Sequence, residues 1–171
     1  MKHIITLLLV ITIALPSFAQ ETGKKNGEIT TYYFIRHAEK DRSDKTNRNP
    51  DLTDAGKTRA IHWSEILQHV KFDAVYSTKY NRTMQTAAPT AEKNKVELQF
   101  YDPRALYSED FAKATQGQTV LVVGHSNTTP AFVNMILKDK KYEDINDNNN
   151  GNLYIVTISN GTTTDQVLTI N

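Results

Sequence analysis

Residues Tyr32–Lys40 have the sequence YYFIRHAEK. Its first four residues are aromatic or β-branched, and together with Thr31 they favour a buried strand over residues 31–35. The apolar run then ends abruptly in Arg36 and His37. The pattern therefore predicts a buried strand that presents a guanidinium and an imidazole at its carboxyl end.

Residues 1–20 have a different character from the rest of the chain. A positive start at Lys2 is followed by an almost continuous apolar run over residues 4–15, and small residues precede Ala19. This pattern is typical of a secretory signal peptide that is cleaved after Ala19 or Gln20, so we expect a periplasmic or secreted bacterial protein. The expected organisation is a signal peptide, a flexible leader and one domain, at residues 1–20, 21–29 and 30–171.

The composition excludes several classes of protein and of site. The sequence contains no cysteine, which rules out disulfides, thiolate catalysis and cysteine zinc sites. The formal net charge is +1 and the basic residues are scattered, so no nucleic-acid partner is expected. No segment after the signal approaches the roughly 20 apolar residues of a spanning helix, and we therefore expect no membrane span.

Short apolar runs alternate with segments of helical periodicity along the rest of the chain. Such alternation predicts an α/β fold with three α/β/α layers, in which helices cover both faces of a mainly parallel central sheet. Pro89 lies inside one expected helix and should kink or split it. An Asn-Gly pair at residues 160–161 predicts a closing β-hairpin. The expected strands are residues 31–35, 72–76, 96–101, 119–123, 153–159 and 166–170, and the expected helices are a segment capped by Thr53 and residues 83–93, 104–115 and 130–137.

Polar side chains follow each of the four strands that we expect to be parallel. The carboxyl ends of parallel strands meet at one edge of the sheet, where ligands bind in folds of this class. Guanidinium groups match phosphate oxygens, and a neutral imidazole can act as a nucleophile. The set predicts a phosphoryl-transfer site that needs no metal ion, because the arginines neutralise the charge. Its members are Arg36 and His37 after the first strand, Arg82 after the second, Asp102 after the third, and His125 and Ser126 after the fourth.

Four ordered motifs resemble those of the histidine phosphatase (phosphoglycerate mutase-like) superfamily. The family hallmark, Arg-His-Gly or Arg-His-Ala after the first strand, is matched by Phe34–Glu39. The family's Leu-Thr-x-x-Gly is matched by Leu52–Gly56, and its Ser-x-x-x-Arg-x-x-x-Thr-Ala segment by Val75–Ala87. The fourth motif is Val122–Thr128, which contains Gly-His-Ser. The sequence is therefore similar to exported members of the short phosphatase type.

The resemblance implies a phosphoglycerate mutase-like fold and a specific chemistry. By it, His37 is the nucleophile that becomes transiently phosphorylated, and Arg36, Arg82 and His125 surround the transferred phosphoryl group, with Ser126 also on the substrate. It implies a metal-independent phosphatase without a cofactor, acting on a small-molecule phosphate ester. Hydrolysis is favoured over mutase activity, since little chain is left for a lid that would shield the phosphoenzyme from water.

The general acid is the least determined part of the predicted site. Relatives that act on alkyl phosphates carry a carboxylic acid beyond the second arginine, and Asp102 fits that position. Asp102 followed by Pro103 is equally suited to cap a helix. Glu109 and Glu39 are the alternative acids. If none of the three donates a proton, the substrate should have a good leaving group.

The substrate is left open among several phosphate compounds. Nutrient phosphoesters, phosphorylated lipopolysaccharide sugars and phosphohistidine are all compatible with the resemblance. A non-catalytic periplasmic phosphate-binding module is the competing hypothesis. The intact pair His37 and His125 favours an enzyme, since binding alone would not need a nucleophile beside the arginines.

Overall fold

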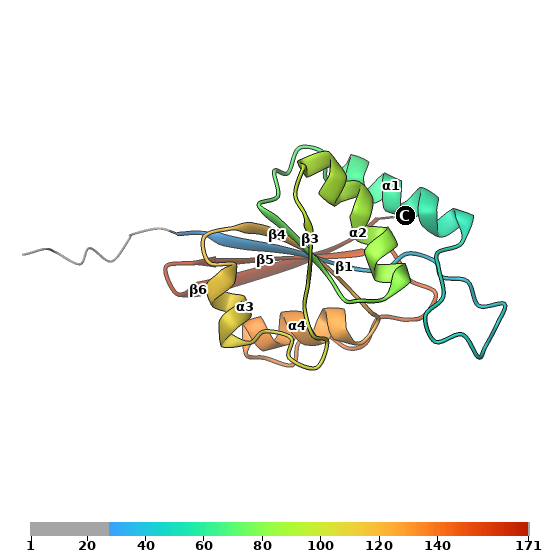
Figure 1. The fold of residues 1–171 in the computed structure, drawn as a ribbon. Helices are drawn as coiled ribbons and strands as arrows, with labels where there is room; N and C mark the ends of the chain where they lie inside the picture. Colours follow the sequence, from blue (N-terminus) through green and yellow to red (C-terminus); the bar gives the residue numbers. More distant parts are fainter. Residues whose placement is uncertain (1–27, 171) are drawn as a thin grey trace, which may run out of the picture.

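A six-stranded sheet runs through the centre of the computed structural model, which describes residues 28–170 (Figure 1). The strands are β1 (Thr30–Arg36), β2 (Ala74–Ser77), β3 (Leu98–Phe100), β4 (Thr119–Gly124), β5 (Asn152–Ser159) and β6 (Thr162–Thr169). They lie in the order β3-β2-β4-β1-β5-β6, and the first four in this order are parallel. β5 pairs antiparallel with β1, and β6 antiparallel with β5. The mainly parallel sheet is confirmed.

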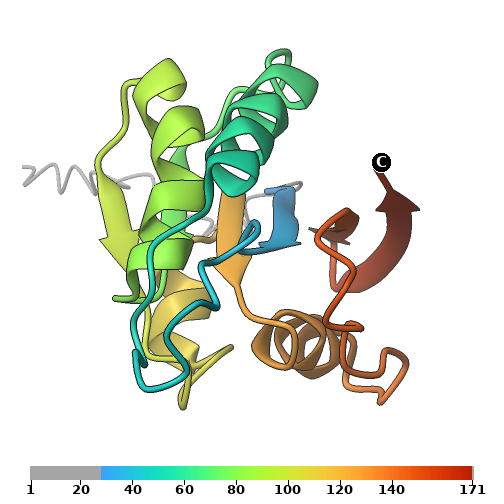
Figure 2. The ribbon, with the colours of Figure 1, turned by 90° about the vertical axis from the view of Figure 1, so that its right-hand side faces the viewer.

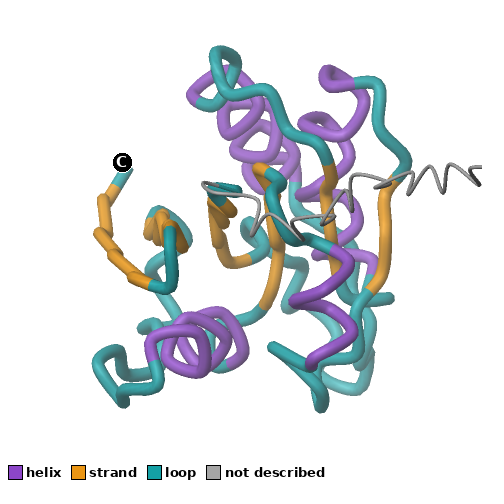
Figure 3. Tube along the Cα trace, turned by 90° about the vertical axis from the view of Figure 1, so that its left-hand side faces the viewer, coloured by secondary structure: helices purple, strands orange, loops and turns teal. Residues whose placement is uncertain are grey.

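Helices cover both faces of the sheet. They are α1 (Asp54–Ile66), α2 (Asn81–Asn94), α3 (Glu109–Ala114) and α4 (Thr128–Leu137). α1 and α2 lie on one face, and α3 and α4 lie on the other, as Figure 1 and the end-on view in Figure 2 show. The view from the opposite end of the sheet shows the same layers (Figure 3). The expected three-layer α/β/α architecture is therefore present.

Alternation along β1 divides the core into two parts. Tyr32 and Phe34 are buried in a cluster with Phe111 of α3 and Phe132 of α4. Ile35 lies in the other cluster, which includes side chains of α1 and α2. Because successive side chains of a strand point to opposite faces, this single strand contributes to both parts of the core. The burial of β1 also fixes the position of the Arg-His pair that follows it.

The first two helices agree with the sequence-based expectation except at a proline. Thr53 is the N-cap of α1, and its side chain accepts a hydrogen bond from the backbone N–H of Gly56. α2 runs without interruption from Asn81 to Asn94 and contains Pro89. The expected splitting at Pro89 is therefore wrong. Proline removes one backbone donor, but the burial of α2 against β2 and α1 holds the remaining turns in register.

The predicted helix over residues 104–115 is shorter than expected. α3 begins at Glu109, and its N-cap is Ser108, whose hydroxyl accepts a hydrogen bond from the N–H of Phe111. Asp102 instead accepts a hydrogen bond from the N–H of Arg104 at 2.9 Å. That short-range bond closes a turn, which competes with helix formation. The proposal that Asp102 caps this helix is therefore wrong.

The chain closes with the predicted hairpin of β5 and β6. Asn160 and Gly161 both have positive φ, at 52° and 79°. A two-residue turn with positive φ at both positions matches the twist of antiparallel strands, and asparagine and glycine tolerate this conformation best. β6 begins at Thr162, four residues before the expected start at residue 166.

The predicted signal peptide and most of the leader lie outside the described residues. Within residues 28–170, no helix is long and apolar enough to cross a membrane.

Candidate active site

Strand register brings the two predicted histidines together. Arg36 at the end of β1 pairs with Gly124 at the end of β4, so the next residues, His37 and His125, leave the sheet side by side. The backbone N–H of His37 still donates to the carbonyl of Gly124 at 2.9 Å. The centroids of the two imidazole rings are 5.5 Å apart. Parallel pairing therefore assembles a site from residues that are far apart in the sequence.

A pocket of about 300 Å³ opens at this edge of the sheet. Five of the six predicted site residues line it. They are Arg36, His37, Arg82, His125 and Ser126. Asp102 does not line this pocket. The predicted phosphate-binding group thus comes together, while the predicted acid lies elsewhere.

His37 is buried and held as a neutral imidazole with one free nitrogen. Nδ1 lies 2.7 Å from the carbonyl oxygen of Ala38. A carbonyl only accepts, so Nδ1 carries the proton and Nε2 keeps its lone pair. Burial lowers the pKa of His37 to about 3, and the charges of Arg36 and Arg82 act in the same direction. At neutral pH, Nε2 is therefore available as a nucleophile.

Arg82 presents largely unsatisfied donors to the pocket. It lies in the first turn of α2, with its guanidinium carbon 4.5 Å from the centroid of the Tyr80 ring. Its Nε is buried and has no hydrogen-bond partner in the described part of the chain. Its Nη1 makes only a long contact of 3.5 Å with the carbonyl of Arg48. Buried donors are normally paired, so this guanidinium indicates an acceptor that enters from the pocket.

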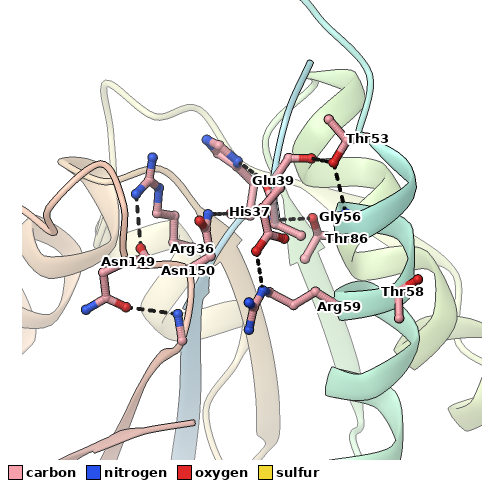
Figure 4. Close-up of polar contacts among 12 residues, drawn as sticks. Arg36, His37, Glu39, Thr53, Gly56, Thr58, Arg59, Thr86, Asn149 and Asn150 are labelled. Atoms are coloured by element: carbon pink, nitrogen blue, oxygen red, sulfur yellow. Dashed lines mark hydrogen bonds and ion pairs between the residues drawn. The ribbon is translucent and has the colours of Figure 1, made fainter. Parts of the chain in front are cut away.

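Arg36 is held differently, by the asparagine-rich loop before β5 (Figure 4). Nη1 donates to the backbone carbonyls of Asn146, Asp147 and Asn149 at 2.9, 3.1 and 3.0 Å. Nη2 donates to Oδ1 of Asp147 at 2.7 Å. Nε is buried and unpartnered within residues 28–170. Arg36 therefore lines the pocket as a rigidly held guanidinium, and much of its fork anchors the loop.

His125 is positioned by a chain of threonine hydroxyls that the sequence reasoning missed. Its Nε2 lies 3.0 Å from Oγ1 of Thr78, which lies 2.9 Å from Oγ1 of Thr83. Both threonines are fully buried. Burial lowers the pKa of His125 to about 4, and the charge of Arg82 adds to the effect. The position of Thr78 directly after β2 could have indicated this contact. Ser77 pairs with Val123, so the residues that follow the two strands leave the sheet at the same edge.

Lys40 is a further pocket residue that the predictions omitted. It follows the Arg-His-Ala-Glu motif, is partly buried, and lines the pocket. Burial and the nearby charges of Arg82 and Arg42 lower its pKa. Among the described residues that line the pocket, Asp147 is the only carboxylate. The pocket is therefore cationic overall and suited to an anion.

The three candidate acids lie away from the pocket wall. Asp102 is exposed and paired with Arg104 at 2.8 Å, and hydrogen bonds from Arg104 lower its pKa to about 2. Glu39 points toward α1, where its carboxylate accepts a hydrogen bond from Arg59 at 2.7 Å (Figure 4). Glu109 is exposed in the first turn of α3. Within residues 28–170, none of the three lines the pocket.

The Leu-Thr-x-x-Gly motif supports the loop that carries His37. The backbone N–H of Thr53 donates to the carbonyl of Glu39 at 2.9 Å. A Cβ added at Gly56 would lie 2.2 Å from the same carbonyl oxygen, which only glycine permits. On the other side, the N–H of Ala38 donates to Oγ1 of Thr86 at 2.9 Å. The loop is therefore held between α1 and α2 (Figure 4).

Comparison with known proteins agrees with this geometry. Residues 32–103 match the model of the histidine phosphatase superfamily (branch 1). A search of curated protein sequences finds no significant match.

Several solved structures share the fold. A candidate alpha-ribazole-5'-P phosphatase from Escherichia coli K-12 is similar with a TM-score of 0.66 and 16% identity, over 82% of this chain and 96% of that one. A candidate phosphohistidine phosphatase, SixA, from Agrobacterium tumefaciens is similar with a TM-score of 0.61 and 17% identity, over 82% of this chain and 99% of that one. Phosphoglycerate mutase from Bacillus anthracis is similar with a TM-score of 0.62 and 16% identity, over 82% of this chain and 92% of that one.

At these identities the solved structures establish the fold, which is phosphoglycerate mutase-like. The sequence match covers the segment that carries Arg36, His37 and Arg82, and the fold adds His125 beside them. Residues 32–103 are therefore similar to the histidine phosphatase superfamily (branch 1), and the fold of the described residues is that of the solved structures.

Proposed function

We propose that this chain is an exported phosphatase that hydrolyses a small phosphomonoester through a phosphohistidine intermediate on His37. One observation carries the proposal. Within residues 28–170, the buried, neutral His37 lines the same pocket as Arg36 and Arg82, and the Nε atoms of both arginines are without a hydrogen-bond acceptor. A nucleophile beside rigid donors without acceptors is the arrangement that phosphoryl transfer requires.

The reaction proceeds by two in-line displacements. The lone pair on Nε2 of His37 forms a bond to phosphorus while the bond from phosphorus to the leaving oxygen breaks, and its electron pair departs with that oxygen. The carbonyl of Ala38 accepts from Nδ1 and so stabilises the positive charge that develops on the ring. Water then attacks phosphorus while the bond from phosphorus to Nε2 breaks and its electron pair returns to the ring, which restores the neutral imidazole. The attacking water releases a proton to solvent, and phosphate departs.

The arginines supply the charge that the transition state needs. Phosphoryl transfer spreads negative charge over three non-bridging oxygens, and donors that are already oriented stabilise it without reorganisation. Arg36 is oriented by four hydrogen bonds to the loop before β5. Arg82 is oriented by its contact with Tyr80. We infer that these groups replace a metal ion, so excess EDTA should leave activity unchanged.

The position of the acids favours a substrate with a good leaving group. Asp147, whose carboxylate lines the pocket, forms ion pairs with Arg36 and Arg42 at 2.7 and 3.0 Å. Hydrogen bonds from these two arginines lower the pKa of Asp147. It is therefore poorly suited to donate a proton. Phosphohistidine, whose nitrogen leaves readily, is a second candidate substrate, and the shared fold with a candidate phosphohistidine phosphatase supports it. Lipopolysaccharide-sugar phosphates are a third candidate, which would require an additional proton donor.

A substrate panel tests the proposal. Purified protein without residues 1–20 should release phosphate from an aryl phosphate, and the panel should include phosphohistidine peptides, sugar phosphates and phosphorylated lipopolysaccharide fragments. Absence of turnover on every member, with retained binding of inorganic phosphate, would instead support the non-catalytic phosphate-binding module.

A further inference from the structure

A second, larger groove adjoins the phosphate pocket. Its volume is about 880 Å³, and it is formed by residues 79–80 after β2 and by residues 100–104, which begin at the last residue of β3. Tyr80 and Pro103 line both the groove and the pocket, so the two spaces are neighbours. A substrate whose phosphoryl group lies at His37 would therefore extend its remaining part into this groove.

The groove presents two partly exposed aromatic rings. Phe100 is 45% exposed and Tyr80 is 37% exposed, although both are large apolar side chains. Tyr80 forms the wall between the two spaces, because its ring lies against both Arg82 and His125. Lys79 places its ammonium 5.4 Å from the centroid of Phe100. Exposed aromatic rings that line a groove beside a reactive site indicate a ligand with an apolar, planar surface.

Among the described residues that line the groove, the carboxylic acid is poorly suited to protonate a leaving oxygen. That carboxylate, Asp102, accepts two hydrogen bonds from the guanidinium of Arg104, at 3.0 and 2.8 Å. An alkyl alcohol departs poorly without a proton, because an alkoxide is a strong base. A phenolic oxygen can leave without being protonated, because a phenolate is a much weaker base than an alkoxide. The paired carboxylate of Asp102 and the aromatic surface of the groove therefore both favour an aromatic leaving group.

We propose that this groove binds the leaving group of the substrate, and that the preferred substrates are phosphate esters of planar aromatic alcohols. The inference rests on the proposed function. The aromatic ring contacts Phe100 and Tyr80 while the phosphoryl group lies between His37 and the arginines. When Nε2 of His37 bonds to phosphorus, the bond to the aryl oxygen breaks, and the aryloxide leaves through the groove and takes a proton from water.

The test compares two activated substrates that differ in the ring. Naphthyl phosphate has an aromatic leaving group, and acetyl phosphate has a good leaving group without a ring. Replacing Phe100 by alanine should lower the ratio of their kcat/KM values about tenfold, since an aromatic contact surface is lost. Phe100→Tyr should keep the wild-type ratio. Ile61→Ala, an exposed position on α1 away from the groove, is the control for a general effect on the protein.

The outcomes separate this inference from the proposed function. An unchanged ratio in Phe100→Ala, with turnover of acetyl phosphate, would overturn the groove assignment and leave the phosphatase intact. Absence of turnover on both substrates would contradict the phosphatase. In that case, calorimetry with naphthyl phosphate and inorganic phosphate still tests the groove assignment. The assignment is supported if naphthyl phosphate binds more tightly than inorganic phosphate and Phe100→Ala removes the difference. Equal affinities of the two ligands for the wild-type protein would overturn it.

Discussion

The tautomer of His37 determines what the site can do at the scale of single residues. Only the lone pair on Nε2 can attack phosphorus, and the carbonyl of Ala38 ensures that the proton stays on Nδ1. The sequence predicted the histidine through its place after β1. It could not predict the tautomer, because the carbonyl that fixes it belongs to the backbone and carries no residue signature.

Thr78 should be a positioning residue that acts through His125. Thr78→Val keeps the volume but removes the hydroxyl that contacts Nε2 of His125, and loss of one hydrogen bond of about 1–1.5 kcal/mol predicts about a tenfold fall in kcat/KM. Thr78→Ser should restore activity. The NMR signals of the His125 ring should shift in the valine variant and not in the serine variant.

Thr90→Val provides a matched control for this prediction. Thr90 is also a buried threonine, on α2, but its hydroxyl has no hydrogen-bond partner within residues 28–170. This variant should retain wild-type activity. Equal losses in Thr78→Val and Thr90→Val would mean that the effect comes from packing rather than from the contact with His125.

The arrangement of elements explains why the loop after β1 is rigid. Parallel pairing of β1 with β4 fixes its start, and α1 fixes its end through Thr53 and Gly56. The sequence predicted both the strand and the cap of α1. It did not predict that the asparagine-rich loop before β5 binds Arg36, since three of the four contacts are to backbone carbonyls. Such contacts are nearly independent of residue type, so the sequence of the asparagine-rich loop indicated a turn and gave no sign of the contact with Arg36.

Gly56→Ala tests the support of this loop. The new Cβ would lie 2.2 Å from the carbonyl oxygen of Glu39, so α1 or the loop must move. We expect a loss of about 1–3 kcal/mol in the free energy of unfolding, as for other overpacked sites, and a fall in kcat. Urea unfolding and the phosphatase assay measure the two effects. Thr58→Ala, at an exposed position on the same helix, should change neither, and wild-type stability of Gly56→Ala would contradict the close approach.

At the scale of the whole molecule, the fold was more predictable than the site. Every strand and helix was expected, because burial on one or both faces leaves a periodic pattern in the sequence. The errors lie where short-range polar contacts compete with periodicity, as at Asp102, or where burial overrides a proline, as at Pro89. Lys40 was missed because a single lysine after a charged motif does not differ from an exposed surface residue in sequence alone.

Burial of two neutral histidines makes stability depend on pH. The pKa of His37 is lowered to about 3 and that of His125 to about 4, below the roughly 6.5 of an unfolded histidine. As pH falls below about 6.5, the unfolded chain binds protons that the folded chain does not, so the free energy of unfolding decreases by up to about 1.4 kcal/mol per pH unit for each histidine. Urea unfolding at pH 7, 6 and 5 measures this slope. His125→Asn should reduce it, and an unchanged slope in that variant would contradict the buried neutral state.

Export is a prediction for the whole chain that rests on residues 1–20. Expression of the full sequence in a Gram-negative host should place the protein in the periplasm, with a mature N-terminus at Gln20 or Glu21. Mass spectrometry of the intact protein identifies the cleavage site. A full-length protein with Met1 in the cytoplasmic fraction would contradict export and leave the catalytic proposal unaffected.

The central claim is that His37 becomes covalently phosphorylated, and trapping the phosphoenzyme tests it most directly. Wild-type protein is mixed with an aryl phosphate that is radiolabelled at phosphorus and quenched within milliseconds in alkaline denaturant, since phosphohistidine is stable to base. The label should be found on the peptide that contains His37 and should be absent from His37→Ala, which should also have lost turnover. His62→Ala, at an exposed position on α1, should retain the label. A labelled His37→Ala protein, or one that still hydrolyses the substrate, would contradict the account.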